Sequence, residues 1–318
     1  MKERDSFRGT SIDDTFADSF KKSRFYKDIY FKHKEEVLIG VRDGFINMYY
    51  NLDNIAKIEV SNPNICKIDR YYTDGEKCRL KEDEIVRYFD KIKGKSCARN
   101  KQEKQAQQRL FIDNNNNSSS KWFCVDVEYT KSFKGREHAE DWRFDIIAIS
   151  KIKPFRVALI ELKYGSHAIG GNSGITEHIK DYYKFHKDNS FEILKPELIS
   201  ILNALVKLGV EVPESLHNVE IGDFAKIPEY YFVTLNNNKE AGRDTLPMET
   251  MAEYLFTKPN GDWKASKNSK KAAEKGYYTI VGDDKSFKPV FLFSEATLPK
   301  LGISDILDES NYVKKIIE

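Results

Sequence analysis

Two short stretches decide the fold of this chain: Arg143-Phe-Asp-Ile-Ile-Ala-Ile149 and Arg156-Val-Ala-Leu-Ile-Glu-Leu-Lys163-Tyr-Gly165. Both are short and rich in branched apolar residues, which is typical of buried β-strands. Successive side chains of a strand point to opposite faces. Glu161 and Lys163 are therefore expected on one face of the second strand, while Ala158, Ile160 and Leu162 pack into a core on the other. The first strand carries an acid of its own, Asp145.

Ionised groups on an apolar strand are costly unless they are paired or hold a metal ion. One acid on one strand, followed by acid-x-Lys at the end of the next, predicts a site for a divalent cation with a lysine beside it. Hard cations prefer carboxylate oxygens, and a bound cation acidifies water and clamps phosphate oxygens. A salt bridge at the sheet edge between Glu161 and Lys163 is the simpler alternative.

The composition leaves several classes of protein open. The chain has 318 residues, of which 40% are hydrophobic and 32% charged, and a net charge of only +2. The basic residues are nevertheless clustered, with seven Lys or Arg against one Glu between Lys91 and Arg109, and six Lys against two acids between Lys258 and Lys275. Such patches can bind phosphate backbones, although a solvated lysine-rich face is the simpler interpretation of either.

The four cysteines form no C-x-x-C pair, so the sequence favours neither a zinc site nor a disulfide framework. No apolar run reaches the length of a membrane span, and the N-terminus lacks an apolar signal segment. We therefore expect a cytoplasmic protein that does not bind membranes.

Three regions are predicted along the chain. Residues 1–24 are polar and weakly periodic and are expected to form a loose arm. Residues 25–98 are expected to form a small β-rich domain, because three apolar stretches read as short antiparallel strands and Asp43-Gly44 is a hairpin signal. A helix near Lys81–Lys91 closes this domain.

Residues 99–318 are predicted to form the main domain with a C-terminal elaboration. Its order is a helix over Asn100–Phe111, a polar loop over Asp113–Ser120, and three strands over Trp122–Tyr129, Phe144–Ser150 and Arg156–Tyr164 in an antiparallel meander. A glycine-rich loop from Gly165 to Gly174 comes next. The elements expected after it are helices over Ile175–His186, Pro196–Leu208 and Met248–Phe256, and strands over Tyr230–Leu235, Tyr277–Val281 and Pro289–Phe293.

From residue 99 to about residue 240, this order, with Asp145 on the second strand and Glu161-Leu-Lys163 on the third, resembles the PD-(D/E)XK nuclease superfamily. The resemblance implies an α/β (α+β) restriction-endonuclease-like core with a mixed central sheet flanked by helices. It also implies that Asp145, Glu161 and the backbone carbonyl of Leu162 bind Mg²⁺, for which Mn²⁺ can substitute, and that Lys163 is the catalytic lysine. The proline of the motif's name is replaced by Phe144.

Further residues could complete the site. The superfamily often adds an acid from the first strand or the preceding helix, which here would be Glu128 or Glu103. One branch of it has Gln-x-x-x-Tyr on the helix after the catalytic strand, where this chain has His178 and Tyr182, so His178 is a candidate to contact phosphate or water. His167 in the glycine-rich loop could touch substrate. Solvated charges and plain loop residues are the alternatives.

Nucleic-acid contacts are expected from basic residues close to these elements. The candidates are Lys101, Lys104 and Arg109 on the helix, and Lys131, Lys134 and Arg136 in the loop between the first two strands. The function expected is a Mg²⁺-dependent nuclease acting on DNA. The alternatives are a non-catalytic nucleic-acid-binding or complex-forming protein on the same fold, and an unrelated α/β domain with surface acids. The choice between DNA and RNA, the strandedness and a homodimer are left open.

Overall fold

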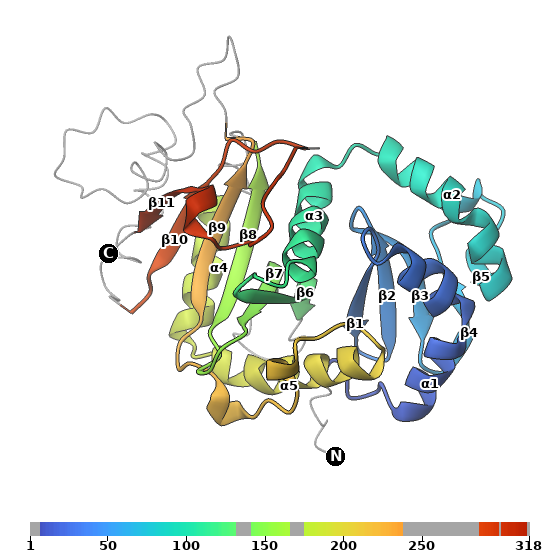
Figure 1. Ribbon diagram of the computed structural model, residues 1–318, viewed down its shortest axis with the longest axis horizontal. Coiled ribbons are helices and arrows are strands. Elements are labelled where there is room, and N and C mark those ends of the chain that lie inside the picture. The colour runs from blue at the N-terminus through green and yellow to red at the C-terminus, as the bar shows by residue number, and fades with distance from the viewer. Residues whose placement is uncertain (1–6, 132–140, 166–174, 238–285, 299, 317–318) are drawn as a thin grey trace, which may run out of the picture.

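The protein consists of two β-sheets joined and covered by helices (Figure 1). The computed structural model describes residues 7–131, 141–165, 175–237, 286–298 and 300–316. The architecture is mixed α/β, as expected.

The N-terminal sheet has five antiparallel strands in the order β1-β2-β3-β4-β5. The strands are β1 (Leu38–Arg42), β2 (Phe45–Tyr50), β3 (Asp53–Glu59), β4 (Asn62–Lys67) and β5 (Arg79–Lys81). The predicted hairpin is confirmed, because Arg42 pairs with Phe45 across the two-residue turn Asp43-Gly44. Gly44 takes a φ of +77°, a left-handed conformation that glycine adopts without strain. The predicted helix is also present, as α2 (Glu82–Ala98).

The central sheet has six strands in the order β11-β10-β9-β8-β7-β6. They are β6 (Trp122–Lys131), β7 (Trp142–Ser150), β8 (Val157–Tyr164), β9 (Glu229–Leu235), β10 (Pro289–Phe293) and β11 (Val313–Ile316). The meander of β6, β7 and β8 is antiparallel, as predicted, whereas β9 joins β8 in parallel and β10 joins β9 in parallel. The central sheet is therefore mixed.

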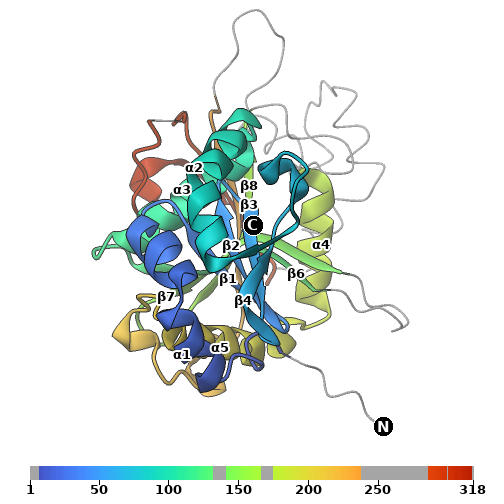
Figure 2. The same ribbon diagram turned by 90° about the vertical axis from the view of Figure 1, so that its right-hand side faces the viewer.

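Helices cover both faces of the central sheet (Figure 1). Helix α3 (Gln102–Asn116) lies on one face, and α4 (Ile175–Lys187) lies on the other, which Figure 2 shows from the side. Helix α5 (Phe191–Lys207) lies across the end of the molecule and reaches both sheets. Short π- or 3-10-helical turns occur at Phe25–Tyr30, Phe31–His33, Arg70–Thr73, Glu214–Leu216, Ile221–Asp223 and Glu309–Asn311.

The prediction of a loose N-terminal arm is wrong for the part of it that is described. Residues Asp14–Lys22 form helix α1, whose N-terminus is capped by the Asp13 side chain, which accepts a hydrogen bond from Phe16 N at 2.7 Å. Phe16 and Phe20 are one helical turn apart and buried. Burial of this apolar stripe anchors the segment, and the polar composition of the arm concealed it.

The predicted loop over Asp113–Ser120 is also partly wrong, since α3 continues to Asn116. The asparagine side chains at its end bind backbone groups of β6. Asn115 accepts a hydrogen bond from Cys124 N at 2.8 Å, and Asn114 donates to Trp122 O at 3.0 Å. These contacts satisfy polar groups that a run of asparagines would otherwise present to solvent. Helix α5 likewise begins at Phe191, earlier than predicted, because buried Phe191 and Leu194 extend its apolar stripe.

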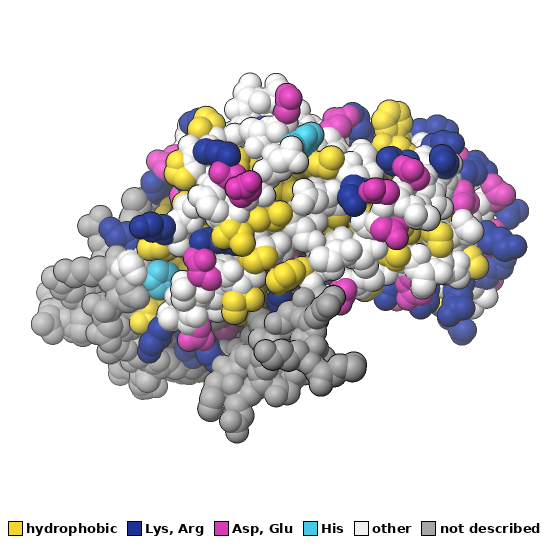
Figure 3. Space-filling model, turned by 90° about the horizontal axis from the view of Figure 1, so that it is seen from below, with side chains coloured by type: hydrophobic (Ala, Val, Ile, Leu, Met, Phe, Trp, Pro, Cys, Tyr) yellow, Lys and Arg dark blue, Asp and Glu magenta, His cyan; other side chains and the backbone are white. Residues whose placement is uncertain are grey.

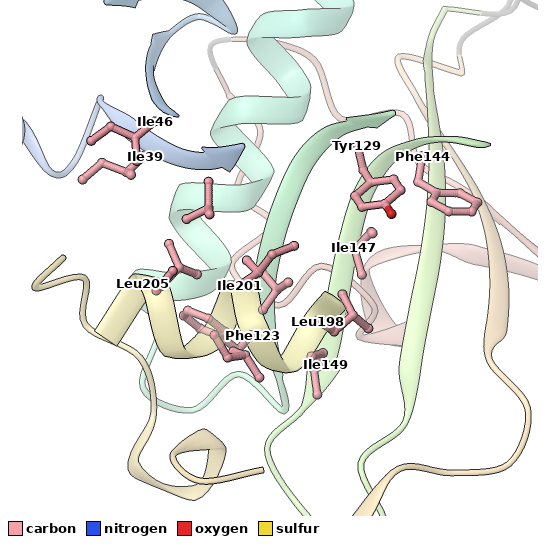
Figure 4. Packing of buried hydrophobic residues seen from close by; sticks show 14 of the residues in the cluster. Ile39, Ile46, Phe123, Tyr129, Phe144, Ile147, Ile149, Leu198, Ile201 and Leu205 are labelled. Carbon is pink, nitrogen blue, oxygen red and sulfur yellow. The ribbon is translucent and has the colours of Figure 1, made fainter. Parts of the chain in front are cut away.

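The hydrophobic core runs continuously from the N-terminal sheet to the central sheet. Figure 4 shows Ile39 and Ile46 of the first sheet above Leu205 of α5, and Phe123 of β6 beside Leu205 and Ile201 of the same helix, all in one cluster. A second cluster fills the α3 side of the central sheet and includes Ala158, Ile160 and Leu162, as the strand alternation predicts. The division into domains at residue 98 stays a prediction.

Several expected elements lie outside the described residues. They are the helix over Met248–Phe256, the strand over Tyr277–Val281, nearly all of the glycine-rich loop and the basic stretch Lys258–Lys275. None of the helices in the described ranges combines the length and the apolar character needed to cross a membrane.

Candidate active site

The antiparallel pairing of β7 with β8 sets Asp145 across from Glu161. Ile146 pairs with Ile160. Asp145, which precedes Ile146, therefore lies opposite Glu161, which follows Ile160. Opposed residues of adjacent strands project from the same face, with Cβ atoms about 5 Å apart. The Asp145 carboxylate also accepts a hydrogen bond from Leu162 N at 2.8 Å, which fastens it to the strand that carries Glu161.

Glu161 is the centre of a buried polar cluster. Its Oε1 lies 2.7 Å from Lys163 Nζ and 3.1 Å from His178 Nε2. Only 2% of Glu161 and 5% of Lys163 is exposed to solvent. The salt bridge between Glu161 and Lys163, the simpler of the two interpretations of the sequence, is therefore present. The bridge is deeply buried at the middle strands of the sheet, where it is costly and seldom a source of stability.

The electrostatics of the cluster favour a cation. Burial raises the pKa of Asp145 to about 7, and the nearby Glu103 and Glu128 add to the rise. Burial, and then the charge of Asp145, raises the pKa of Glu161 well above its usual range. Burial alone would lower the pKa of Lys163, but Glu161, Glu103 and Asp145 outweigh it, so this pKa is raised and the amine stays charged. Ionisation of either carboxyl group therefore costs free energy in this site, and a bound divalent cation would lower that cost.

Two further acids adjoin the pair. Glu103 on α3 has its Oε1 3.8 Å from Lys163 Nζ, and its Oε2 accepts a hydrogen bond from Tyr164 N at 3.4 Å. Glu128 on β6 forms an ion pair of 3.3 Å with Lys104. Both acids raise the pKa of Asp145, so they lie within its electrostatic reach.

Glu128 also has an unusual backbone, with a φ of +50° inside strand β6. The left-handed region is uncommon for residues other than glycine, and it is enriched at functional sites. The preceding bulge between Cys124 and Asp126 shifts the register of the same strand. This local geometry interrupts the strand's alternation. Asp126 and Glu128, two residues apart, have different partners: Asp126 pairs with arginines and Glu128 with Lys104.

Helix α4 brings two predicted side chains to Glu161. His178 contacts it directly, and Tyr182, one turn later, is fully buried. Burial raises the pKa of Tyr182 well above its usual range, and Glu161 and Asp145 add to the rise. Tyr182 packs edge-on against Phe144, with ring centroids 5.3 Å apart. Phe144, the residue before Asp145, thus holds the helix against the site.

Those candidate nucleic-acid-binding residues that the structure describes each have an acidic partner. Lys101 lies 3.2 Å from Asp53, Arg109 lies 2.7 Å from Asp113, and Lys131 lies 2.5 Å from Glu197, while Lys104 is paired with Glu128. Lys134, Arg136 and His167 lie outside the described residues. Figure 3 shows Lys and Arg side chains, interspersed with acids, gathered at the end of the molecule where Figure 1 has β4, β5 and α2.

Sequence reasoning missed a buried ion network beside the site. Asp126 binds Arg42 at 2.7 Å and Arg8 at 3.1 Å, and Arg8 lies 3.4 Å from Glu197 of α5. Tyr129 donates a hydrogen bond to Glu197 at 3.0 Å. The network ties the N-terminal segment, β1, β6 and α5 together. A charge between two valines of a predicted strand was the only signal of it in the sequence, and the partners lie far away along the chain.

The site fits a hard divalent cation. Asp145, Glu161 and the Leu162 carbonyl offer oxygen donors only. The cations near the two carboxyl groups are too few to neutralise both of them together with the neighbouring Glu103 and Glu128. Among the described residues, no three His, Cys, Asp or Glu side chains are gathered so as to hold a metal by themselves. A cation here would therefore use two carboxylates with backbone and solvent oxygens, which is how proteins commonly bind Mg²⁺.

A groove lies along the N-terminal sheet and reaches Glu128, one of the acids near Asp145. It has a volume of about 700 Å³ and is lined by residues of β2, β3, β4 and the turn before α3, and by Lys104, Glu128 and Thr130 at the edge of the central sheet. Glu128, one of its lining residues, also raises the pKa of Asp145, so the groove comes within electrostatic reach of the site.

No protein-family model, no curated protein and no solved structure matches this chain. The class that fold and site define is thus a mixed α/β protein with two sheets and a buried acid-lysine cluster on the middle strands of the larger one.

Proposed function

We propose that this protein is a Mg²⁺-dependent nuclease that hydrolyses phosphodiester bonds in DNA, built on a restriction-endonuclease-like core. One observation carries the proposal: Asp145 and Glu161 are opposed on adjacent strands, and Lys163 lies 2.7 Å from Glu161 in a buried site. The mixed sheet with helices on both faces is consistent with that core.

Asp145, Glu161 and the Leu162 carbonyl would hold the cation. When bound, Mg²⁺, or Mn²⁺ in its place, supplies a more acidic water and positive charge at the phosphate oxygens. The hydrogen bond from Leu162 N fixes Asp145 relative to β8, so both carboxylates are preorganised before substrate arrives.

Lys163 supplies a second positive charge at the reacting phosphate. It keeps its proton because Glu161, Glu103 and Asp145 raise its pKa despite burial. An ammonium has three donors and no acceptor, so it can orient a water or donate to a phosphate oxygen but cannot bind a cation. His178 holds Glu161 from the α4 side and thereby acts as a positioning residue.

Cleavage assays test the proposal. Supercoiled, linear and single-stranded DNA are incubated with Mg²⁺, Mn²⁺ or EDTA, using the wild type, Asp145→Asn, Glu161→Gln and Lys163→Ala. Glu229→Gln is the matched control, because Glu229 is an acid at the opposite end of the same sheet, paired with Arg156 at 2.7 Å. We expect metal-dependent cleavage by the wild type and the control, and none by the three site variants.

Absence of cleavage from every substrate, with binding retained, would refute the proposal and favour the second candidate, a non-catalytic nucleic-acid-binding protein on this fold. The intact Asp, Glu and Lys of the buried cluster favour the enzyme.

A further inference from the structure

The groove between the two sheets has the chemistry of a polynucleotide track. Among the described residues, five cationic and three acidic side chains line it, the cations being Arg42, Lys57, Lys67, Arg99 and Lys104. It is polar, open and continuous with Glu128, at the edge of the candidate active site.

The charges of the groove are arranged in clusters of two cations on one acid. Lys57 and Lys67 share Glu59, at 3.7 and 2.7 Å. Arg99 and Lys101 share Asp53, at 3.1 and 3.2 Å. Each cluster keeps one positive charge in excess, although each of its cations has a partner. The groove thus presents two cationic clusters to phosphates, against the single negative charge of Asp69, which also lines it.

The groove also offers an aromatic surface. Phe45 is half-buried in its wall, and Lys57 Nζ lies 3.8 Å from the centroid of its ring. Grooves that bind single strands combine ammonium groups for the phosphates with rings near the bases. The bases of a duplex are paired and stacked, so they cannot use such a ring.

Burial of the active site favours a single strand as well. Glu161 is only 2% exposed and Lys163 only 5%. A phosphate must therefore be brought close to a recessed pair of side chains, and a flexible strand can bend toward it where a stiff duplex cannot.

We propose that this groove binds single-stranded nucleic acid through Lys57, Lys67 and Arg99 and leads the strand past Lys104 to the Asp145–Glu161 site. That the groove supplies substrate for cleavage rests on the proposed function, but binding to the groove can be tested without cleavage.

The experiment measures binding of a labelled oligothymidylate of about 16 nucleotides, a length that such grooves accommodate, in EDTA over a series of salt concentrations. The variant is Lys57→Ala/Lys67→Ala. The matched control is Lys21→Ala/Lys207→Ala, two lysines of similar exposure that each pair with one acid, on α1 and α5. A duplex of the same length serves as competitor.

Loss of the one excess charge of this cluster, and with it one phosphate contact, should reduce the slope of log affinity against log salt by about 0.7 on a single strand. The control should keep the wild-type slope, and Lys57→Arg/Lys67→Arg should restore it. An unchanged slope in the alanine variant, or a duplex that competes as well as the single strand, would overturn the inference. If the wild type cleaves no substrate but the alanine variant shows the reduced salt slope, the nuclease proposal is refuted and the groove proposal stands.

Discussion

Replacing Asp145 by Asn should stabilise the cation-free protein, and increasingly so as the pH rises. In the wild type, burial raises the pKa of this carboxyl from 3.8 to about 7. The folded state therefore binds the proton more tightly than the unfolded state does. The resulting stability is fully present below the unfolded pKa, and it is lost as the pH rises through the folded pKa.

The magnitude follows from that shift. A rise in pKa from 3.8 to about 7 corresponds to roughly 4 kcal/mol at 1.36 kcal/mol per pKa unit. This is an upper limit, because Asp145 is only half-buried and solvent screens part of the cost. Asn can still accept the hydrogen bond from Leu162 N, so the packing should be preserved.

The assay is urea unfolding in EDTA at about pH 5 and about pH 8, either side of the folded pKa. The difference in free energy of unfolding between Asp145→Asn and wild type should be larger at the higher pH by several tenths to about 2.7 kcal/mol, because about two pKa units separate pH 5 from the folded pKa, at 1.36 kcal/mol each. Added Mg²⁺ should restore stability to the wild type and much less to the variant, because ligand binding stabilises only a folded state with an intact site. Glu229→Gln is the control. A difference that does not vary with pH would show that Asp145 is solvated and that the proposed cost of ionisation is absent.

Three further results are expected. Lys163→Ala should lower the cleavage rate by roughly 10²–10³-fold, as for other preorganised charge stabilisers, with Mg²⁺ affinity measured by calorimetry nearly unchanged; wild-type cleavage would remove its catalytic role. Affinity for Mg²⁺, measured the same way, should weaken by up to about tenfold for each pH unit below the raised pKa of Asp145, because the cation must displace a proton; an affinity independent of pH would contradict this. Asp126→Asn should lower the free energy of unfolding by about 3–5 kcal/mol in denaturant titrations, since it leaves Arg42 buried without its acid and Arg8 with Glu197 alone, and a loss below about 1 kcal/mol would mean that the network is solvated.

The strands and the acid pair could be predicted because their signals are local. The meander of β6, β7 and β8 follows from apolar runs with short connections, and the pairing places Asp145 opposite Glu161. The alternation of β8 correctly assigned Leu162 to the core and Glu161 to the other face. Helical spacing brought His178 and Tyr182 to the same side of α4.

Other features could not be predicted because their partners are distant in sequence. Helix α1 depends on burying Phe16 and Phe20 against the rest of the protein, and the asparagines that end α3 depend on the backbone of β6. The basic residues Lys101 and Lys104 were expected to be available to phosphates, but the fold supplies each with an acid.

The sequence by itself determined strands β6 to β10 and helix α4, and which charges interrupt them, because alternation and helical spacing are properties of neighbouring residues. Only the tertiary structure decided what those charges meet. The left-handed backbone at Glu128, the burial that raises the pKa of Asp145, and the groove in which Lys57 and Lys67 share Glu59 all arise from packing between segments that no local pattern relates. Electrostatic energies depend on distance and burial, and both are set by the folded chain.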